Sequence, residues 1–260
     1  MPIIQSVDRA LRILDLFDEN ENEIKITDIS NRMGLHKSTV HSLLKTLHMR
    51  GYIDQNPENG KYKLGMKLFE RGNMVIHGLD IRKIAKTHLV DLSTKTGQTT
   101  HLGILNGKEG VYIDKVEGPK AVILYSRIGR RIPIHCSAIG KCLVAFKDKE
   151  ELRKLLQGYV YDVQTSKTIT NEEDFLVELE LIGKRGYAMD NQENEPGVCC
   201  IAVPIHDHTG QVIAAVSMST LVTQVDDAEL ERFTEMLKKE ANGMSHKMGY
   251  GMLMQSLVHN

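Results

Sequence analysis

One stretch of the sequence, residues 37–47, combines an apolar stripe with a face of hydrogen-bonding side chains. Val40, Leu43, Leu44 and Leu47 recur at the spacing of one helical face, so we expect them to be buried. The opposite face offers donors and no carboxylate, which suits the phosphates and base edges of a DNA major groove. The residues expected to face DNA from this helix and its end are Lys37, Ser38, Thr39, His41, Ser42, Lys45 and Arg50.

A short basic hairpin follows this helix. Two strand-like runs, 52–54 and 61–64, flank the turn-forming sequence NPENG. Lys61 and Lys63 alternate with apolar residues, so one face of the second strand is basic. With a helix before it and a turn at Gly34, the pattern predicts a winged helix-turn-helix. A three-helix packing unit with a solvated face is the alternative, but it does not explain why the turn, stripe and hairpin occur together.

In this docking, the first turn of the helix contacts phosphate. The base edges are reached by His41, Ser42 and Lys45, and the DNA backbone is held by Arg50, Lys61 and Lys63.

A second group of residues could bind a small anion. Ser137 can cap a helix whose first N–H groups, those of Ala138, Ile139 and Gly140, would then point outward and attract a carboxylate. Asp190 precedes a loop that ends at Cys199 and Cys200, and two serines share one face of a later strand. The polar candidates on these strands are Asp190, Cys200, Ser217 and Ser219. Taken singly, such serines and cysteines are usually core residues; together they favour a ligand pocket.

Charge is unevenly distributed along the chain. The 260 residues carry 33 basic and 34 acidic side chains, a net charge of −1. Residues 1–30 hold three basic and seven acidic side chains, whereas residues 31–66 hold six basic and two acidic ones. The positive charge therefore lies on the elements proposed to contact DNA. The four cysteines lack C-x-x-C spacing, and no run is long and apolar enough to span a bilayer, so we expect a reduced, cytoplasmic protein with no membrane partner.

The order of the remaining elements predicts an α+β fold with an antiparallel sheet. Helices are expected over 6–17, 66–77, 81–96, 137–146, 150–157, 171–185 and 226–248, and strands over 99–105, 110–116, 121–126, 198–206 and 212–219. Ser6 and Thr27 are the expected caps of the first two helices. The domain prediction is a winged helix-turn-helix over 1–65, a linker helix over 66–78 and a ligand-binding domain over 79–260.

The chain resembles the IclR family of bacterial transcriptional regulators. The resemblance rests on SVDRALRILDLF, ITDISNRMGLHKSTVHSLLKTL and GYIDQNPENGKYKLG in the first part, and on YSRIGRRIPIHCSAIGK and DNQENEPGVCCIAVPI later. It covers essentially the whole chain, and is greatest to the subgroup that represses 2-keto-3-deoxygluconate and pectin catabolism. It implies a GAF-like effector domain and a repressor of sugar-acid catabolism genes.

The resemblance also implies how such a protein assembles and responds. The linker helix pairs subunits, giving a homodimer or homotetramer on a palindromic double-stranded operator. A small carboxylate effector, such as 2-keto-3-deoxygluconate or another 2-oxo acid, controls binding. The family's effector contacts correspond here to Ala138, Ile139, Asp190, Cys200, Ser217 and Ser219. Ile139 is bulkier than its counterpart, which bears on the identity of the effector. The alternative for the linker helix is that it packs on its own domain.

Two other functions fit parts of the sequence. A GAF-like enzyme could use Cys199 or Cys200, but that interpretation gives the basic helix and wing no role. A metal-responsive regulator could use His101, His135, Asp190 and Cys200, although their spacing lacks the close His/Cys pairs of most metal sites. No catalytic motif is complete, so we expect no catalytic residue, no metal and no cofactor.

Overall fold

The computed structural model describes residues 3–18, 21–77, 80–119 and 126–251. The chain divides into two compact units, Met1–Gly78 and Leu79–Asn260. Each unit has a hydrophobic core of its own.

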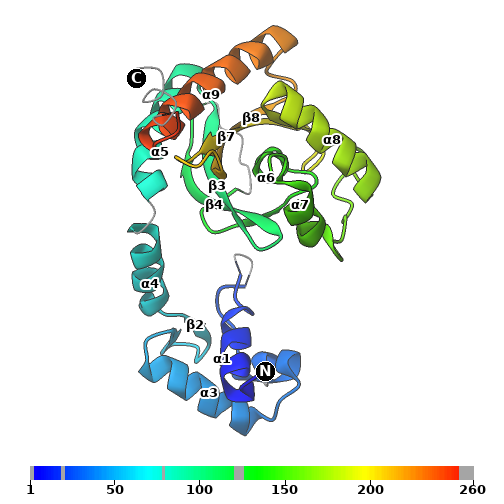
Figure 1. Ribbon diagram of the computed structural model, residues 1–260. Coiled ribbons are helices and arrows are strands. Elements are labelled where there is room, and N and C mark those ends of the chain that lie inside the picture. Colours follow the sequence, from blue (N-terminus) through cyan, green and yellow to red (C-terminus); the bar gives the residue numbers. More distant parts are fainter. Residues whose placement is uncertain (1–2, 19–20, 78–79, 120–125, 252–260) are drawn as a thin grey trace. The chain divides into compact units, whose positions relative to one another are not determined.

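The first unit is a winged helix-turn-helix (Figure 1). Its elements are α1 (Gln5–Leu14), α2 (Ile26–Met33), α3 (Lys37–Met49), β1 (Ile53–Gln55), β2 (Tyr62–Leu64) and α4 (Met66–His77). Gly34 ends α2 with φ +63°, a left-handed conformation that glycine adopts without steric cost. Val40 and Leu44 of α3 are fully buried against Ile13 and Ile29, as the apolar stripe predicts.

The hairpin forms as expected, with β1 and β2 paired antiparallel and Ile53 opposite Leu64. Ile24 adds a bridge to the outer side of β2, where its N–H and carbonyl both bond with Tyr62 at 2.9 Å. The wing is therefore a small three-stranded arrangement that begins before α2.

The expected helix caps in this unit are wrong. Helix α1 begins at Gln5 and ends at Leu14, so Ser6 lies inside it and Ile4 takes the capping position. Helix α2 begins at Ile26 after Lys25, and the Thr27 hydroxyl donates to Asp28 instead of capping. Neither capping residue contributes a side-chain bond, because packing of the apolar faces fixes these two starts.

The second unit is built on a six-stranded antiparallel sheet, which confirms the α+β prediction. The sheet order is β5-β4-β3-β8-β7-β6. Its strands are β3 (Thr99–Asn106), β4 (Glu109–Val116), β5 (Arg131–Pro133), β6 (Ala188–Asn191), β7 (Val198–His206) and β8 (Val212–Leu221). The edge strands β5 and β6 were not expected from the sequence, and the expected strand over 121–126 falls almost wholly outside the described residues.

Helices cover both faces of this sheet (Figure 1). One face carries α5 (Asp80–Thr96) and α9 (Asp227–Lys247), which bury residues such as Leu102, Val216 and Phe233. The other face carries α6 (Ala138–Val144), and α8 (Glu172–Arg185) packs against α6. Helix α7 (Lys149–Leu156) joins the same core through Leu156. None of the described helices is long and apolar enough to cross a membrane.

Gly65 provides a stability test of the wing's close packing. A Cβ at Gly65 would lie 2.2 Å from the Gly51 carbonyl oxygen, so Gly65→Ala should lower the free energy of unfolding by about 1–3 kcal/mol. Gly72→Ala is the matched control: a Cβ there meets nothing within 4 Å inside α4 and should add about 0.5–1 kcal/mol. Native-state hydrogen exchange at the Ile24 and Tyr62 amides measures both effects. Equal exchange in the two variants would contradict the packing argument.

Candidate nucleic-acid interface and ligand cavity

The outer face of α3 is exposed and free of acidic residues. Val40 and Leu44 point into the core, whereas Lys37, His41 and Lys45 are exposed and make no hydrogen bond or ion pair within the described ranges. The hydroxyls of Ser42 and Thr46 donate back to carbonyls of their own helix, from Ser42 to Ser38 and from Thr46 to Ser42. Ser38 and Arg50 are exposed as well, and Thr39 is half-buried. This face therefore presents cations that have no partner within the described ranges.

The wing adds two more cations to the same unit. Tyr62 is buried, while Lys63 is exposed and Lys61 is half-buried on either side of it. Leu64, expected to alternate inward with Tyr62, is 44% exposed because the core ends at Tyr62. The basic character of the hairpin is retained, but of the apolar residues of β2 only Tyr62 lies in the core.

A polar cavity lies on the face of the sheet that carries α6. The register brings Asp190 on β6 opposite Cys200 on β7, and Cys200 opposite Ser219 on β8. The space within it that a water-sized molecule can occupy is about 30 Å³, enough for roughly one or two water molecules. Its lining comprises His101, Tyr112, Ser126, Arg130, Ile132, Asp190, Asn194, Glu195, Val198, Cys200 and Ser219.

His101 is a fully buried histidine with one unsatisfied nitrogen. Its Nε2 lies 2.9 Å from the Ser126 hydroxyl, and its ring lies against Tyr112 with the centroids 4.7 Å apart. Nδ1 has no hydrogen-bond partner among the described residues. Burial, with a smaller effect from Lys115, lowers the pKa of His101 to about 3, so the ring is neutral at physiological pH. A neutral ring offers a lining atom that a ligand or water can satisfy.

Asp190 is a buried carboxyl on the opposite wall. Its Oδ1 accepts the backbone N–H groups of Glu193 at 2.7 Å and Asn194 at 3.2 Å. Burial raises the pKa of Asp190 to about 7, helped by the nearby Glu193 carboxylate and opposed by the two backbone bonds. Near neutral pH this group therefore exchanges between a proton donor and an acceptor.

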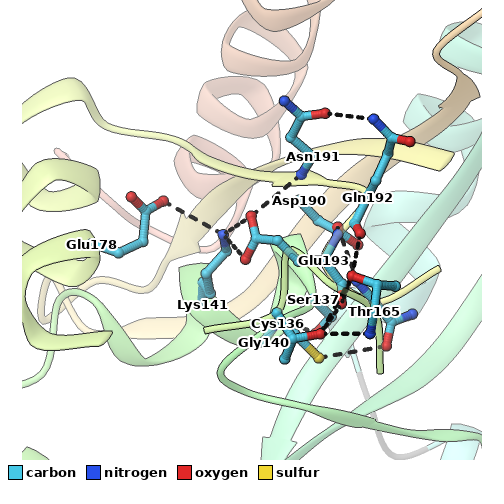
Figure 2. A network of polar contacts seen from close by, with 12 residues as sticks. Cys136, Ser137, Gly140, Lys141, Thr165, Glu178, Asp190, Asn191, Gln192 and Glu193 are labelled. Atoms are coloured by element: carbon cyan, nitrogen blue, oxygen red, sulfur yellow. Dashed lines mark hydrogen bonds and ion pairs between the residues drawn. The ribbon is translucent and has the colours of Figure 1, made fainter. Parts of the chain in front are cut away.

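A buried ion pair supports that wall (Figure 2). The Lys141 ammonium, 1% exposed, lies 2.7 Å from Glu193 Oε1 and 2.8 Å from Oε2, with Glu178 of α8 at 3.5 Å. Thr168 donates to the carbonyl of Glu193, and Thr165 donates to that of Gln192. Gln192 has φ +64°, the only positive φ among the described non-glycine residues. The loop between β6 and β7 is thus fixed by contacts with Lys141, Thr165 and Thr168.

The structure brings together part of the predicted effector site. Asp190, Cys200 and Ser219 line the cavity, whereas Ser217, on the same face of β8, is buried beside it and is not part of the lining. Ala138, Ile139 and Gly140 form the first turn of α6 and are also outside the lining. Ser137 caps α6 as predicted. Its hydroxyl oxygen accepts the Gly140 N–H at 3.1 Å, so the Gly140 N–H is not available to a ligand, contrary to the expectation.

Sequence reasoning missed several lining residues: Tyr112, Ser126, Ile132, Asn194, Glu195 and Val198. They come from strands and loops far apart in the chain and become neighbours only when the sheet forms. Tyr112 in particular faces His101 after a bulge at Leu102 and Gly103, which no local pattern indicates. Asn194 and Glu195 follow Asp190 in an asparagine- and glutamate-rich loop, which was the only sequence signal for them.

The alternative sites find little support in the geometry. Burial raises the pKa of Cys199 to about 11 and that of Cys200 well above its ordinary value, which suppresses the reactive thiolate. Cys200 Sγ lies 3.1 Å from the Ser219 hydroxyl, which is not a base. Both ring nitrogens of His135 are bonded, to Tyr159 and to the Asp162 carbonyl. In the described part of the chain, no three His, Cys, Asp or Glu residues gather in a metal-binding group.

The raised pKa of Asp190 predicts a pH-dependent stability difference. Between about pH 4 and pH 7, unfolded Asp190 is ionised while the folded group keeps its proton, so this residue makes the protein less stable as pH rises. Asp190→Asn keeps the shape of the side chain but does not titrate. As pH rises through that window, its free energy of unfolding should increase relative to that of the wild type by about 1.4 kcal/mol per pH unit, and the difference should be constant above it. Denaturant unfolding from pH 4 to pH 9 measures the difference; a pH-independent difference would contradict the assignment.

Two domain models match the chain: the IclR helix-turn-helix domain over residues 6–57 and the C-terminal domain of bacterial IclR transcriptional regulators over 73–246. The chain is 58% identical to the HTH-type transcriptional regulator XynR of Escherichia coli K12, covering 96% of this chain and 99% of that protein. It is 39% identical to KdgR of the same organism, covering 95% and 94%.

Solved structures agree. The Thermotoga maritima IclR crystal structure matches with a TM-score of 0.78 at 36% identity, covering 95% of this chain and 100% of that one. An IclR homologue from Microbacterium hydrocarbonoxydans, complexed with 4-hydroxybenzoate, matches with a TM-score of 0.81 at 26% identity, covering 94% and 98%. The helix-turn-helix, the polar cavity and these matches lead to one conclusion: this chain belongs to the IclR family of DNA-binding transcriptional regulators.

Proposed function

We propose that this regulator is a cytoplasmic repressor of sugar-acid catabolism genes, and that a small hydroxylated or 2-oxo carboxylate releases it from its operator. The observation that carries the ligand half of the proposal is the polar cavity in the second unit, lined by His101, whose Nδ1 has no partner among the described residues. The relatives support the regulatory half, since XynR and KdgR are themselves transcriptional regulators.

On the DNA side, α3 enters the major groove and the wing contacts the backbone. Lys37, Ser38 and Thr39 lie in the first turn of α3 and hold phosphate, while His41, Ser42 and Lys45 reach base edges from the exposed face. Arg50 at the end of α3, with Lys61 and Lys63 of the wing, adds backbone contacts. The absence of intramolecular partners for Lys37, His41 and Lys45 in the described chain supports this docking.

The protein acts as a homodimer, or a pair of dimers, on a palindromic operator. Exposed apolar side chains support self-association: Val7 and Leu11 of α1 are 53% and 57% exposed, and Phe69 and Met74 of α4 are 62% and 64% exposed. Exposed aliphatic and aromatic residues on two helices are typical of a surface that pairs with a copy of itself.

The cavity favours an acid that also carries hydroxyl or carbonyl groups. Arg130 supplies a positive charge for a carboxylate, and the neutral His101 offers a polar nitrogen. Glu195 and Asp190 accept from ligand hydroxyls, a role that a purely apolar acid leaves unfilled. The 2-keto-3-deoxygluconate molecule meets these demands, and the 4-hydroxybenzoate bound by the homologue is also a hydroxylated carboxylate. Because the enclosed space is small, lining side chains must move apart as such a ligand enters.

Ligand binding weakens operator binding only if the ligand prefers the subunit arrangement that misplaces the recognition helices. Helix α4 directly precedes the ligand-binding unit in the chain and has exposed apolar residues, so it is the element through which we propose the two sites are coupled.

The DNA docking predicts a loss of salt dependence. Lys37→Ala and Lys63→Ala should each lower the slope of log affinity against log salt by about 0.9 per chain, because each removes one phosphate contact. The affinity is measured on a duplex that the wild-type protein selects from a random-sequence pool. Lys154→Ala, which removes an exposed lysine of α7 paired with Glu150, is the charge-matched control and should leave the slope unchanged. If all three variants keep the wild-type slope, α3 and the wing do not contact DNA as proposed.

The ligand site predicts a selective loss of response. Ser219→Ala removes a lining hydroxyl and should abolish release of the selected duplex by the effector while leaving ligand-free DNA affinity near that of the wild type. Ser217→Ala, on the same strand but outside the lining, should respond normally. A thermal-shift screen of sugar acids and 2-oxo acids, beginning with 2-keto-3-deoxygluconate, identifies the effector. A normal response in Ser219→Ala would place the ligand elsewhere.

A further inference from the structure

Glu23 makes an unusual contact with the wing. Its two carboxylate oxygens accept from two different asparagines of the hairpin turn: Oε1 from Asn56 Nδ2 and Oε2 from Asn59 Nδ2, both at 2.9 Å. Glu23 directly precedes Ile24, whose backbone pairs with Tyr62 of β2. The carboxylate is thus delivered to the turn by the same segment that forms the third strand of the wing.

The side-chain oxygens of both asparagines are already bonded within the turn, so only their NH₂ groups can bond to Glu23. Asn56 Oδ1 accepts the Glu58 N–H at 2.9 Å, and Asn59 Oδ1 accepts the Lys61 N–H at 2.8 Å. Each amide therefore uses its oxygen to build the turn and directs its NH₂ group outward. The NH₂ groups of Asn56 and Asn59 each donate to a different oxygen of residue 23. A carboxylate has two acceptor oxygens, whereas a carboxamide has only one. A glutamine at position 23 could satisfy only one of them in this geometry.

The cations of the wing lie near this contact. The hydrogen bonds from Asn59 and Asn56 lower the pKa of Glu23, and the charges of Lys63 and Lys61 lower it further, so the group stays ionised. An acid beside a DNA-binding surface ordinarily weakens binding by repelling phosphate. Here Glu23 bonds to the turn that joins β1 to β2. Lys63 lies in β2, and Lys61 directly precedes it.

We propose that Glu23 is the positioning residue of the wing: its carboxylate holds the Asn56–Gly60 turn and so sets how Lys61 and Lys63 approach the DNA backbone. The inference rests on the wing docking proposed above. It has an uncommon consequence, since removing this one acidic side chain should weaken DNA binding, whereas removing a neighbouring acid should not.

Three variants of the full chain separate positioning from charge. Glu23→Gln removes one charge and one acceptor. Glu58→Gln removes one charge from the turn, but the Glu58 side chain makes no bond within the described chain and only its backbone N–H is used. The double variant Glu23→Gln with Asn59→Asp keeps the wild-type net charge and exchanges donor for acceptor. The new amide at position 23 accepts from Asn56 and donates to the new carboxylate at position 59, which still accepts the Lys61 N–H.

Two measurements are made on each variant. Hydrogen exchange at the Glu58 and Lys61 amides measures the local stability of the turn. Titration of a random-sequence duplex at several salt concentrations gives the slope of log affinity against log salt. For Glu23→Gln we expect exchange at both amides to accelerate at least about tenfold, the result of losing about 1.4 kcal/mol of local stability, and the salt slope to fall by up to about two units per chain. Glu58→Gln should match the wild type in exchange and bind DNA equally well or more tightly. The double variant should recover both wild-type values.

Other outcomes overturn the inference. If Glu23→Gln exchanges like Glu58→Gln, the carboxylate does not hold the turn. If exchange accelerates but the slope is unchanged while Lys63→Ala lowers it, the wing binds DNA without needing Glu23. If Lys63→Ala also leaves the slope unchanged, the wing docking itself is wrong, and the exchange data still show whether Glu23 holds the turn. Failure of the double variant to recover exchange would show that hydrogen-bond pattern is not the cause.

Discussion

The wall of the ligand cavity depends on one buried positive charge. The Lys141 ammonium is 1% exposed, and an ammonium taken out of water is costly unless anions surround it. Its partners come from different places in the chain, Glu178 from α8 and Glu193 from the loop after β6. Removing the lysine or its closest glutamate would leave an uncompensated charge, so α6, α8 and this loop must remain together. The pair therefore specifies a geometry more than it adds stability.

The same pair explains the state of Asp190. Both oxygens of Glu193 bond to Lys141, and the Lys141 charge only partly offsets the desolvation of Asp190. Two acids three residues apart thus differ in role: Glu193 neutralises the buried cation, while Asp190 is left with backbone N–H donors and a pKa of about 7. A cavity wall that can either donate or accept a proton suits a ligand with both carboxylate and hydroxyl groups.

The sequence predicted what local pattern controls and missed what tertiary contact controls. The 3.6-residue periodicity located α3, which buries Val40 and Leu44, and β-rich runs between turn signals located β3, β4, β7 and β8. The three-residue β5 and four-residue β6 are too short to show a pattern, and they exist because a neighbouring strand pairs with them. Lys141 follows the predicted anion-binding turn, but its burial and its ion pair with Glu193 give it a structural role. The cavity residues predicted from the sequence were single polar groups on strands. Tyr112 and Asn194 could be placed at the cavity only once the strand register was known.

The two candidate surfaces carry groups that have no partner among the described residues, but in opposite environments. On α3 these groups are exposed cations, which cost little in water and would gain affinity by releasing counterions in the docking proposed above. At the cavity, His101 is buried and neutral, and its Nδ1 has no partner among the described residues, which costs free energy until something bonds to it. Glu23 follows neither pattern, because it is an acid fully satisfied by the wing. Its role is therefore better sought in the shape of the DNA-binding surface than in a contact with the ligand.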